Sequence, residues 1–152
     1  IFIFIVQSTF AQAPDILWEH GYGGNHDDRG YEVLETLDGG FLMVGQEQSI
    51  DGDIIDNHGL DDVYVVKTDM NGEIIWSRAY GGSDYDYGKA ACLAHDGGYI
   101  IAGNSGSMDG NLTGNNGFKD LWVFKLDDLG DIVWQFNYGG SHNGNSSQTD
   151  PT

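Results

Sequence analysis

The stretch IIWSRAYGG, residues 74–82, is one of three similar stretches in the chain. The other two are ILWEHGYGG at 16–24 and IVWQFNYGG at 132–140. Each copy holds one tryptophan, and the three are spaced 58 residues apart: Trp18, Trp76 and Trp134. Residues 18–75 align with 76–133 without a gap. A fixed period of this size indicates a repeat architecture, such as a solenoid, a propeller or an array.

Each repeat contains four short runs of β-branched and aromatic residues, separated by turns that contain glycine. Asp38-Gly39-Gly40 and Asp96-Gly97-Gly98 follow the first runs, while Asn71-Gly72 and Leu129-Gly130 follow the third. Such turns favour antiparallel hairpins. We therefore expect an all-β chain. The predicted strands are 31–37, 41–47, 62–69, 73–80, 89–95, 99–104, 120–126 and 131–138, preceded by a lone strand at 16–22.

The apolar pattern within the runs indicates how the sheets pack. The first three runs of each repeat are nearly continuous in apolar residues, as in FLMV and VYVV, which is typical of strands buried on both faces. The fourth run carries polar residues such as Arg78 and Gln135, as an exposed outer edge does. Sheets packed face to face around an axis are β-propeller blades. We predict two four-stranded antiparallel blades plus one N-terminal outer strand, as a fragment of a larger propeller or a chain that assembles with copies of itself.

The repeats share a longer string over residues 16–140. It runs W-x3-Y-G-G, then D-G-G-[FY], a loop rich in Asp, Gly and Asn, and finally D-[VL]-[YW]-V-[VF]-K-x-D-x-x-G. This string resembles the secreted β-propeller repeats of Bacteroidota-type surface proteins. The resemblance implies a propeller fold and export. It implies no particular reaction, because propellers host many functions.

The two ends of the chain differ from the repeats. Residues 1–11, IFIFIVQSTFA, are an apolar run followed by small and polar residues, typical of a signal peptide and too short to span a bilayer. We interpret them as a signal-peptide remnant, with a core strand as the alternative, and expect a secreted or cell-surface protein. The repeat region is 12–140, with a third repeat starting at 134, and 141–152 is a polar tail or linker. Cys92 is the only cysteine, so no internal disulfide is possible.

The net charge of the chain limits the classes of molecule that it can bind. The sequence has 24 Asp and Glu against 6 Lys and Arg, a formal net charge of −18. An acidic surface repels phosphate backbones and anionic lipid heads, so we expect no nucleic-acid partner and no membrane insertion after signal removal. The same surface attracts Ca²⁺ and cationic groups.

One end of the predicted blades collects the long polar loops. Loops between second and third strands, 49–61 and 107–119, lie at the same end as the segments that begin each repeat, 23–30 and 81–88. Function is commonly carried by loops on a rigid scaffold, so we expect this loop face to bind a protein or carbohydrate ligand. The predicted ligand-binding residues are His26, Asp27, Arg29, Asp84, Tyr85 and Tyr87. The alternative is that these tyrosines only pack between adjacent loops.

Calcium is the cofactor that the loop residues suggest. Ca²⁺ takes six to eight oxygen ligands from carboxylates, amides and backbone carbonyls. The candidate ligands are Asp51, Asp53, Asp56, Asn57, Asp109, Asn111 and Asn115. In the alternative interpretation these side chains form Asx-turns that cap the loops.

The motifs of common enzymes do not occur in the sequence. There is no G-x-S-x-G, H-E-x-x-H, Cys/His pair or phosphate-binding loop. We therefore predict an exported, non-catalytic module for binding or surface interaction; the alternative is the propeller portion of a secreted carbohydrate-active enzyme. Further blades or copies of the chain are the other expected partners. Lys67 and Lys125 are expected to be buried against a neighbouring aspartate, Asp28 or Asp86.

Overall fold

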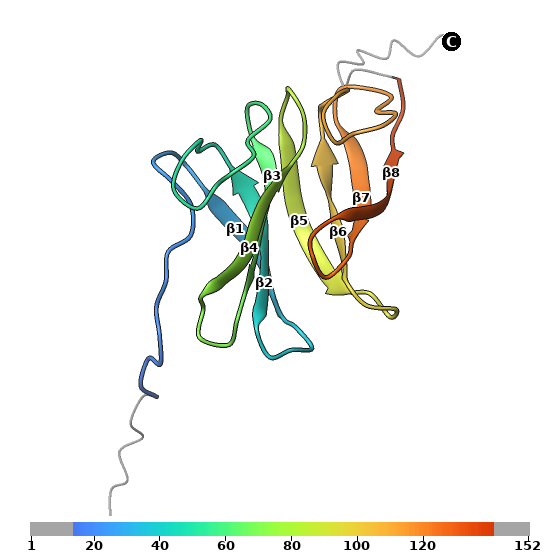
Figure 1. The fold of residues 1–152 in the computed structure, drawn as a ribbon. Helices are drawn as coiled ribbons and strands as arrows, with labels where there is room; N and C mark the ends of the chain where they lie inside the picture. Colours follow the sequence, from blue (N-terminus) through green and yellow to red (C-terminus); the bar gives the residue numbers. More distant parts are fainter. Residues whose placement is uncertain (1–13, 142–152) are drawn as a thin grey trace, which may run out of the picture.

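The computed structural model describes residues 14–141, which form two β-sheets and no helix (Figure 1). The strands are β1 (Arg29–Glu35), β2 (Phe41–Glu47), β3 (Asp62–Thr68), β4 (Ile74–Tyr80), β5 (Asp86–Leu93), β6 (Tyr99–Ser105), β7 (Asp120–Leu126) and β8 (Ile132–Tyr138). The first sheet has the order β1-β2-β3-β4 and the second β5-β6-β7-β8, and all neighbouring strands are antiparallel. The predicted all-β class and the two four-stranded antiparallel sheets are confirmed.

The hairpin turns of both sheets place a glycine of positive φ at equivalent positions. Gly39 has a φ of 81° and its counterpart Gly97 a φ of 93°. In the turns before the last strands, Gly72 and Gly130 have φ values of 83° and 84°. Glycine adopts positive φ without the clash that a Cβ atom causes. The glycine turns therefore fix the hairpins, as the sequence predicts.

Strands β1 and β5 begin earlier than predicted. Arg29 pairs with Gln46, and Asp86 pairs with Ser105. In both strands the register shifts just after a glycine, Gly30 or Gly88, as at a β-bulge. These irregular pairs extend both strands toward the loop face. The predicted remnant 1–11, and the predicted tail 141–152 apart from its first residue, lie outside the described residues.

The predicted lone strand at 16–22 is wrong, because this segment has no strand structure. A strand needs a hydrogen-bonded neighbour, and the segment is attached to the first sheet through side chains instead. The Tyr22 hydroxyl donates to the Gly72 carbonyl at 2.7 Å, and the ring of Trp18 lies 5.6 Å from that of Phe41. Tyr80 of β4 donates in the same way to Gly130, at 2.6 Å. The segment thus contacts the first sheet as β4 contacts the second.

The hydrophobic core lies between the two sheets. Its fully buried members come from both sheets: Leu42, Val63, Val65, Ile101, Trp122, Phe124 and Leu126. Removal of these apolar side chains from water is what holds the sheets face to face. The expectation that the first run of each repeat is buried on both faces is wrong for β1, and also for β5, where Lys89, Ala90, Cys92 and Leu93 are exposed. Strand β1 is a sheet edge whose residues are exposed except for the half-buried Leu34.

The two recurring lysines are buried, but not against the predicted partners. Lys67 Nζ lies 2.9 Å from Asp38 Oδ2, and Lys125 pairs with Asp96. Lys67 stands opposite Leu42 in the ladder, close to the Asp-Gly-Gly turn and far along the strand from the loop face. The prediction that Asp28 or Asp86 pairs with these lysines is therefore wrong. The partners are the turn aspartates, Asp38 and Asp96.

Candidate functional site

The long loops at one end of the sheets are held by side chains that accept backbone hydrogen bonds. In the first repeat, Asp51 Oδ1 accepts from the Asn25 N–H at 2.9 Å, and Asp53 Oδ2 from the Gly23 N–H at 3.3 Å. The Ser49 hydroxyl accepts from the His26 N–H at 2.9 Å. Loop 49–61 is thereby fastened to the segment that begins the repeat.

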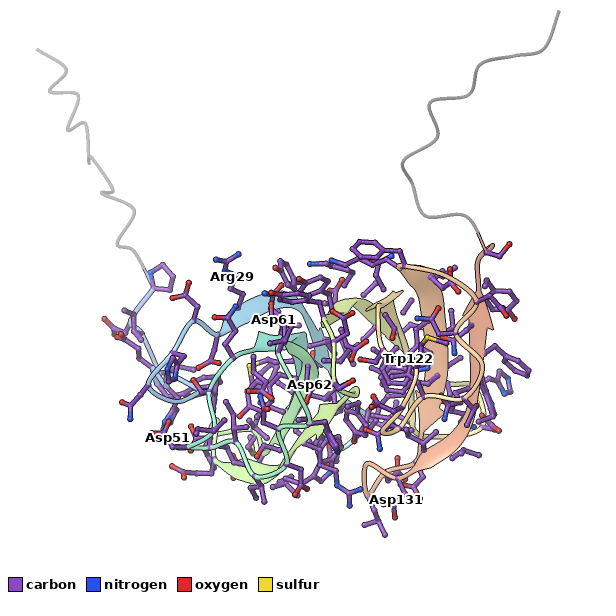
Figure 2. The ribbon with its side chains drawn as sticks, turned by 90° about the horizontal axis from the view of Figure 1, so that it is seen from above. Arg29, Asp51, Asp61, Asp62, Trp122 and Asp131 are labelled. Carbon is purple, nitrogen blue, oxygen red and sulfur yellow. The ribbon has the colours of Figure 1, made fainter. Side chains whose placement is uncertain are left out.

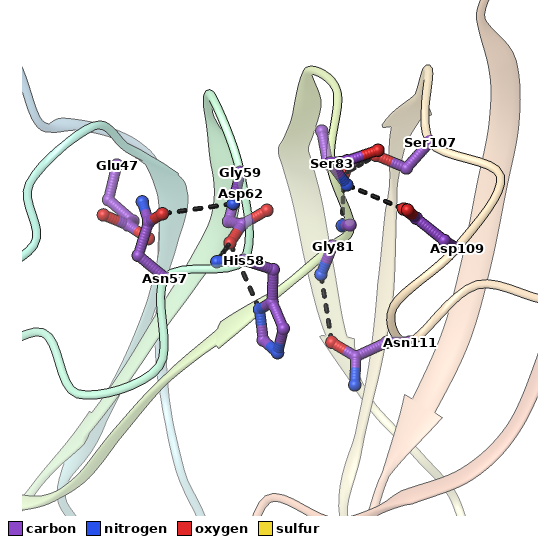
Figure 3. Close-up of polar contacts among 12 residues, drawn as sticks. Glu47, Asn57, His58, Gly59, Asp62, Gly81, Ser83, Ser107, Asp109 and Asn111 are labelled. Atoms are coloured by element: carbon purple, nitrogen blue, oxygen red, sulfur yellow. Dashed lines mark hydrogen bonds and ion pairs between the residues drawn. The ribbon is translucent and has the colours of Figure 1, made fainter.

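The second repeat uses the equivalent residues for the same contacts (Figure 3). Asp109 Oδ1 accepts from the Ser83 N–H at 2.7 Å, and Asn111 Oδ1 from the Gly81 N–H at 3.0 Å. The Ser107 hydroxyl accepts from the backbone of Asp84 at 2.9 Å. Because positions 58 residues apart bond alike, the loop face is a built and repeated structure.

These contacts place most of the predicted calcium ligands. Asn57 donates to Glu47 Oε1 at 3.1 Å, and Asn115 donates to the Ser107 carbonyl at 2.9 Å. Asp51, Asp53, Asp109 and Asn111 accept backbone N–H groups as described above, while Asp56 lines a hollow beside Arg78. Within residues 14–141, no three acidic, His or Cys side chains gather closely enough to hold a metal. Calcium binding stays a prediction.

Three tyrosines and two lysines form one cluster, here called the tyrosine–lysine patch: Tyr31, Tyr85, Tyr87, Lys89 and Lys119. Lys89 Nζ lies 3.4 Å from the ring centre of Tyr31 and 5.1 Å from that of Tyr87. Lys119 Nζ lies 4.6 Å from the Tyr87 ring centre and 5.4 Å from that of Tyr85. The Tyr85 and Tyr87 rings stack at 6.3 Å. A cation over a ring face is attracted to the π electrons of the ring. These contacts therefore hold the lysine ammonium groups and the tyrosine rings in fixed positions relative to one another.

The patch lies where β1 and β5 leave the loop face. The Tyr31 hydroxyl donates to Gln46 Oε1 at 2.5 Å, and Gln46 Nε2 donates to Asp61 Oδ2 at 3.0 Å. Asp61 also forms a β-bridge with Tyr85. Seen from above, Arg29 and Asp61 lie along one side of the molecule and Asp131 on the opposite side (Figure 2). The patch is thus anchored to the sheets on the side of Asp61.

The lysines of the patch differ from the other cations of the chain. The guanidinium groups and the other ammonium groups form ion pairs: Arg29 with Asp27, Lys67 with Asp38, Arg78 with Asp131 and Lys125 with Asp96. Among residues 14–141, Lys89 and Lys119 make no ion pair. The two ammonium groups of the patch therefore have no directly paired carboxylate in this part of the chain, although the buried Asp61 lies beside the patch.

The structure unites only part of the predicted ligand-binding set. Tyr85 and Tyr87 belong to the patch. Asp27 and Arg29 pair with each other at 3.4 Å, His26 is fastened by its backbone to Ser49, and Asp84 Oδ1 accepts from the Tyr85 N–H at 2.8 Å. Sequence reasoning missed three patch members: Tyr31, Lys89 and Lys119. Tyr31 and Lys89 occupy equivalent positions of the two repeats, near the start of the first strand. The replacement of an aromatic residue by a cation at this position is the sequence signal that could have pointed to them.

Five carboxyl groups are buried just beneath the loops, those of Glu47, Asp61, Asp62, Asp86 and Asp120. Glu47, Asp62 and Asp86 are fully buried, and each has one oxygen without a hydrogen-bond partner among the described residues. Burial raises the pKa of Glu47 to about 7 and that of Asp62 to about 6, because the charged form loses its hydration. Glu47 and Asp62 therefore change charge near neutral pH.

Comparison with protein-family models and with curated proteins finds no match for this chain. Among residues 14–141 there is also no helix long and apolar enough to cross a membrane.

Proposed function

We propose that this chain is an exported, non-catalytic binding module whose sheets are β-propeller blades. Its ligand is a carbohydrate that carries an acidic group, and the tyrosine–lysine patch is the binding site. The resemblance of the repeats supports export and the propeller. The face-to-face packing of the two sheets through the shared apolar core supports the blade arrangement.

The exposure of the tyrosine rings beside unpaired lysines is the observation that carries the proposal. Tyr31 is 42% and Tyr85 39% exposed. The exposed parts of these rings offer apolar surface against which the C–H groups of a sugar can pack, while the phenol hydroxyl supplies a polar contact. An acidic sugar would also meet the ammonium groups of Lys89 and Lys119. A neutral or cationic ligand would leave that charge unused.

Calorimetric titration with trigalacturonate, using cellotriose as the uncharged control sugar, tests the proposal. Trigalacturonate should bind more tightly than cellotriose, and the recovered sugar should be unchanged. Tyr85→Ala should weaken binding about fivefold, because a lost stacking contact costs on the order of 1 kcal/mol. Lys119→Gln should weaken binding of the charged sugar only.

The matched control is Tyr138→Ala, since Tyr138 is equally aromatic, 58% exposed and outside the patch. It should leave the affinity unchanged. An equal loss for Tyr85→Ala and Tyr138→Ala would contradict the assignment of the patch. Absence of heat with either sugar would leave a protein ligand as the occupant, and cleavage of the sugar would favour the carbohydrate-active enzyme.

A further inference from the structure

The interface between the two sheets joins two different kinds of face. The first sheet contributes its forward face, made of Leu42, Val44, Val63 and Val65. The second sheet contributes its rear face, made of Tyr99, Ile101, Trp122 and Phe124. Since the repeats align without a gap, each sheet has both kinds of face. The interface uses only one face of each sheet, and one forward and one rear face remain outside it.

The free forward face belongs to the second sheet and is apolar; Leu121 is exposed and its other members are half-buried. Its members are the counterparts of the buried forward face: Ile100, Ala102, Leu121 and Val123. Leu121 is 45% exposed, whereas its counterpart Val63 is 0% exposed. On the outer strand, Tyr138 is 58% exposed and its counterpart Tyr80 only 3%. These two positions, which the second sheet buries on the first sheet, are thus exposed on the second sheet. A further sheet packed in the same way would cover Leu121 and Tyr138.

The rear face outside the interface belongs to the first sheet. Tyr22 and Ile54 cover part of it by packing on Met43, Tyr64 and Val66, and a hollow remains where the interface has side chains. A Cβ atom built on Gly88 would lie 2.5 Å from a methyl of Val44 and 2.7 Å from one of Val63. The counterpart Gly30 meets nothing within 4 Å. It borders a hollow of about 400 Å³ lined by Met43 and Tyr64 among others. The residues equivalent to Val44 and Val63 in the second sheet are Ala102 and Leu121.

We propose that the free forward face of one copy of this chain docks on the free rear face of a second copy. Leu121 then fills the hollow beside Gly30, as Val63 fills the space beside Gly88. Strand β8 takes the place of the segment 16–22, which carries the equivalent aromatic residues. Strand β8 displaces the segment 16–22 because the segment is paired with no strand, whereas β8 is hydrogen-bonded to β7.

A second copy is the occupant that fits, because every copy carries both halves of the interface. The contact is head-to-tail, so successive copies either close a ring or extend a filament. A net charge of −18 per copy opposes association, and salt should therefore strengthen it by screening. This inference does not depend on the ligand of the tyrosine–lysine patch.

Sedimentation velocity of the whole chain, from about 5 to about 500 µM in low and high salt, tests the docking. The mass should rise with concentration and with salt. Two variants block one face each. Gly30→Leu places a side chain in the hollow, where its Cβ atom has no neighbour within 4 Å, and Leu121→Arg puts a charge on the forward face. The matched control is Ile55→Arg, because Ile55 is 75% exposed in a loop and lies on neither face.

Each blocked variant should be monomeric alone, and Ile55→Arg should associate like the natural chain. An equimolar mixture of Gly30→Leu and Leu121→Arg should give a species of two chains, since each variant retains the face that the other lacks. A natural chain that stays monomeric throughout would overturn the proposal. Self-association of Gly30→Leu alone would overturn the head-to-tail arrangement, and circular dichroism of both variants checks that the sheets are retained.

Discussion

Replacement of Glu47 by glutamine should stabilise the protein increasingly as the pH rises from 5 to 8. Glu47 is 0% exposed, and its burial raises the pKa of the carboxyl from an ordinary 4.5 to about 7. Between these values the folded chain retains the proton and the unfolded chain releases it. The contribution of Glu47 to the free energy of unfolding therefore falls as the pH rises from about 4.5 to about 7. Above this range the contribution no longer changes with pH.

The size of the effect follows from the pKa. One pKa unit corresponds to about 1.4 kcal/mol, so the ionised carboxylate costs the folded state about 3 kcal/mol above pH 7. Glutamine has no charge to bury, and its amide oxygen can still accept from Asn57. The gain over the natural chain should grow by about 2 kcal/mol between pH 5 and pH 8. The second repeat already has an uncharged residue here, the buried Ser105.

Urea denaturation followed by tryptophan fluorescence at each pH measures the difference. Glu35→Gln is the matched control, because Glu35 is exposed on β1, and its effect should not change with pH. A constant difference between Glu47→Gln and the natural chain across the range would refute the reasoning. So would a loss of stability in the variant at pH 8.

Three further predictions concern the turns and the loops. Asp38→Ala removes the carboxylate that pairs with the buried Lys67 and should cost about 1 kcal/mol in urea denaturation, because Asp38 itself is 58% exposed and the pair is partly screened; unchanged stability would show that the pair does not hold the hairpin. Tyr80→Phe deletes a buried hydrogen bond and should cost about 1 kcal/mol, while Tyr138→Phe at the equivalent exposed position should cost nothing, and equal losses would contradict the packing. If the loops bind calcium, adding Ca²⁺ should raise the melting temperature by mass action and Asp109→Ala should remove part of that gain; identical melting in Ca²⁺ and in chelator would reject the metal site.

The strands were predictable because hairpin signals are local. The Asp-Gly-Gly turn and the run that follows it specify β1 and β2 within a few residues. The segment 16–22 shows the limit of such signals, since a strand also requires a neighbour that no local pattern contains. The partner of Lys67 was missed for a related reason. Only the register of β2 against β3 reveals at which end of the strand the ammonium group lies.

The candidate site was predictable where one loop holds several members of it. Tyr85 and Tyr87 are two residues apart, so their shared location could be read directly. Tyr31 joins them only because the edges of β1 and β5 lie side by side, with Lys89 between the rings. Packing between sheets decides this contact. The roles of Asp51 and Asp109 also needed the structure, because ligation of calcium and capping of a backbone N–H use the same residue types.

Backbone amide shifts of the labelled protein during titration with trigalacturonate test most directly whether the tyrosine–lysine patch is the binding site. The largest saturable shifts should fall at Tyr31, Tyr85, Tyr87, Lys89 and Lys119, with little change at the turns Asp38–Gly40 and Asp96–Gly98 at the opposite end of the sheets. Tyr85→Ala should abolish the shifts at low sugar concentration. Saturable shifts centred on those turns, or on β8, would contradict the proposed function.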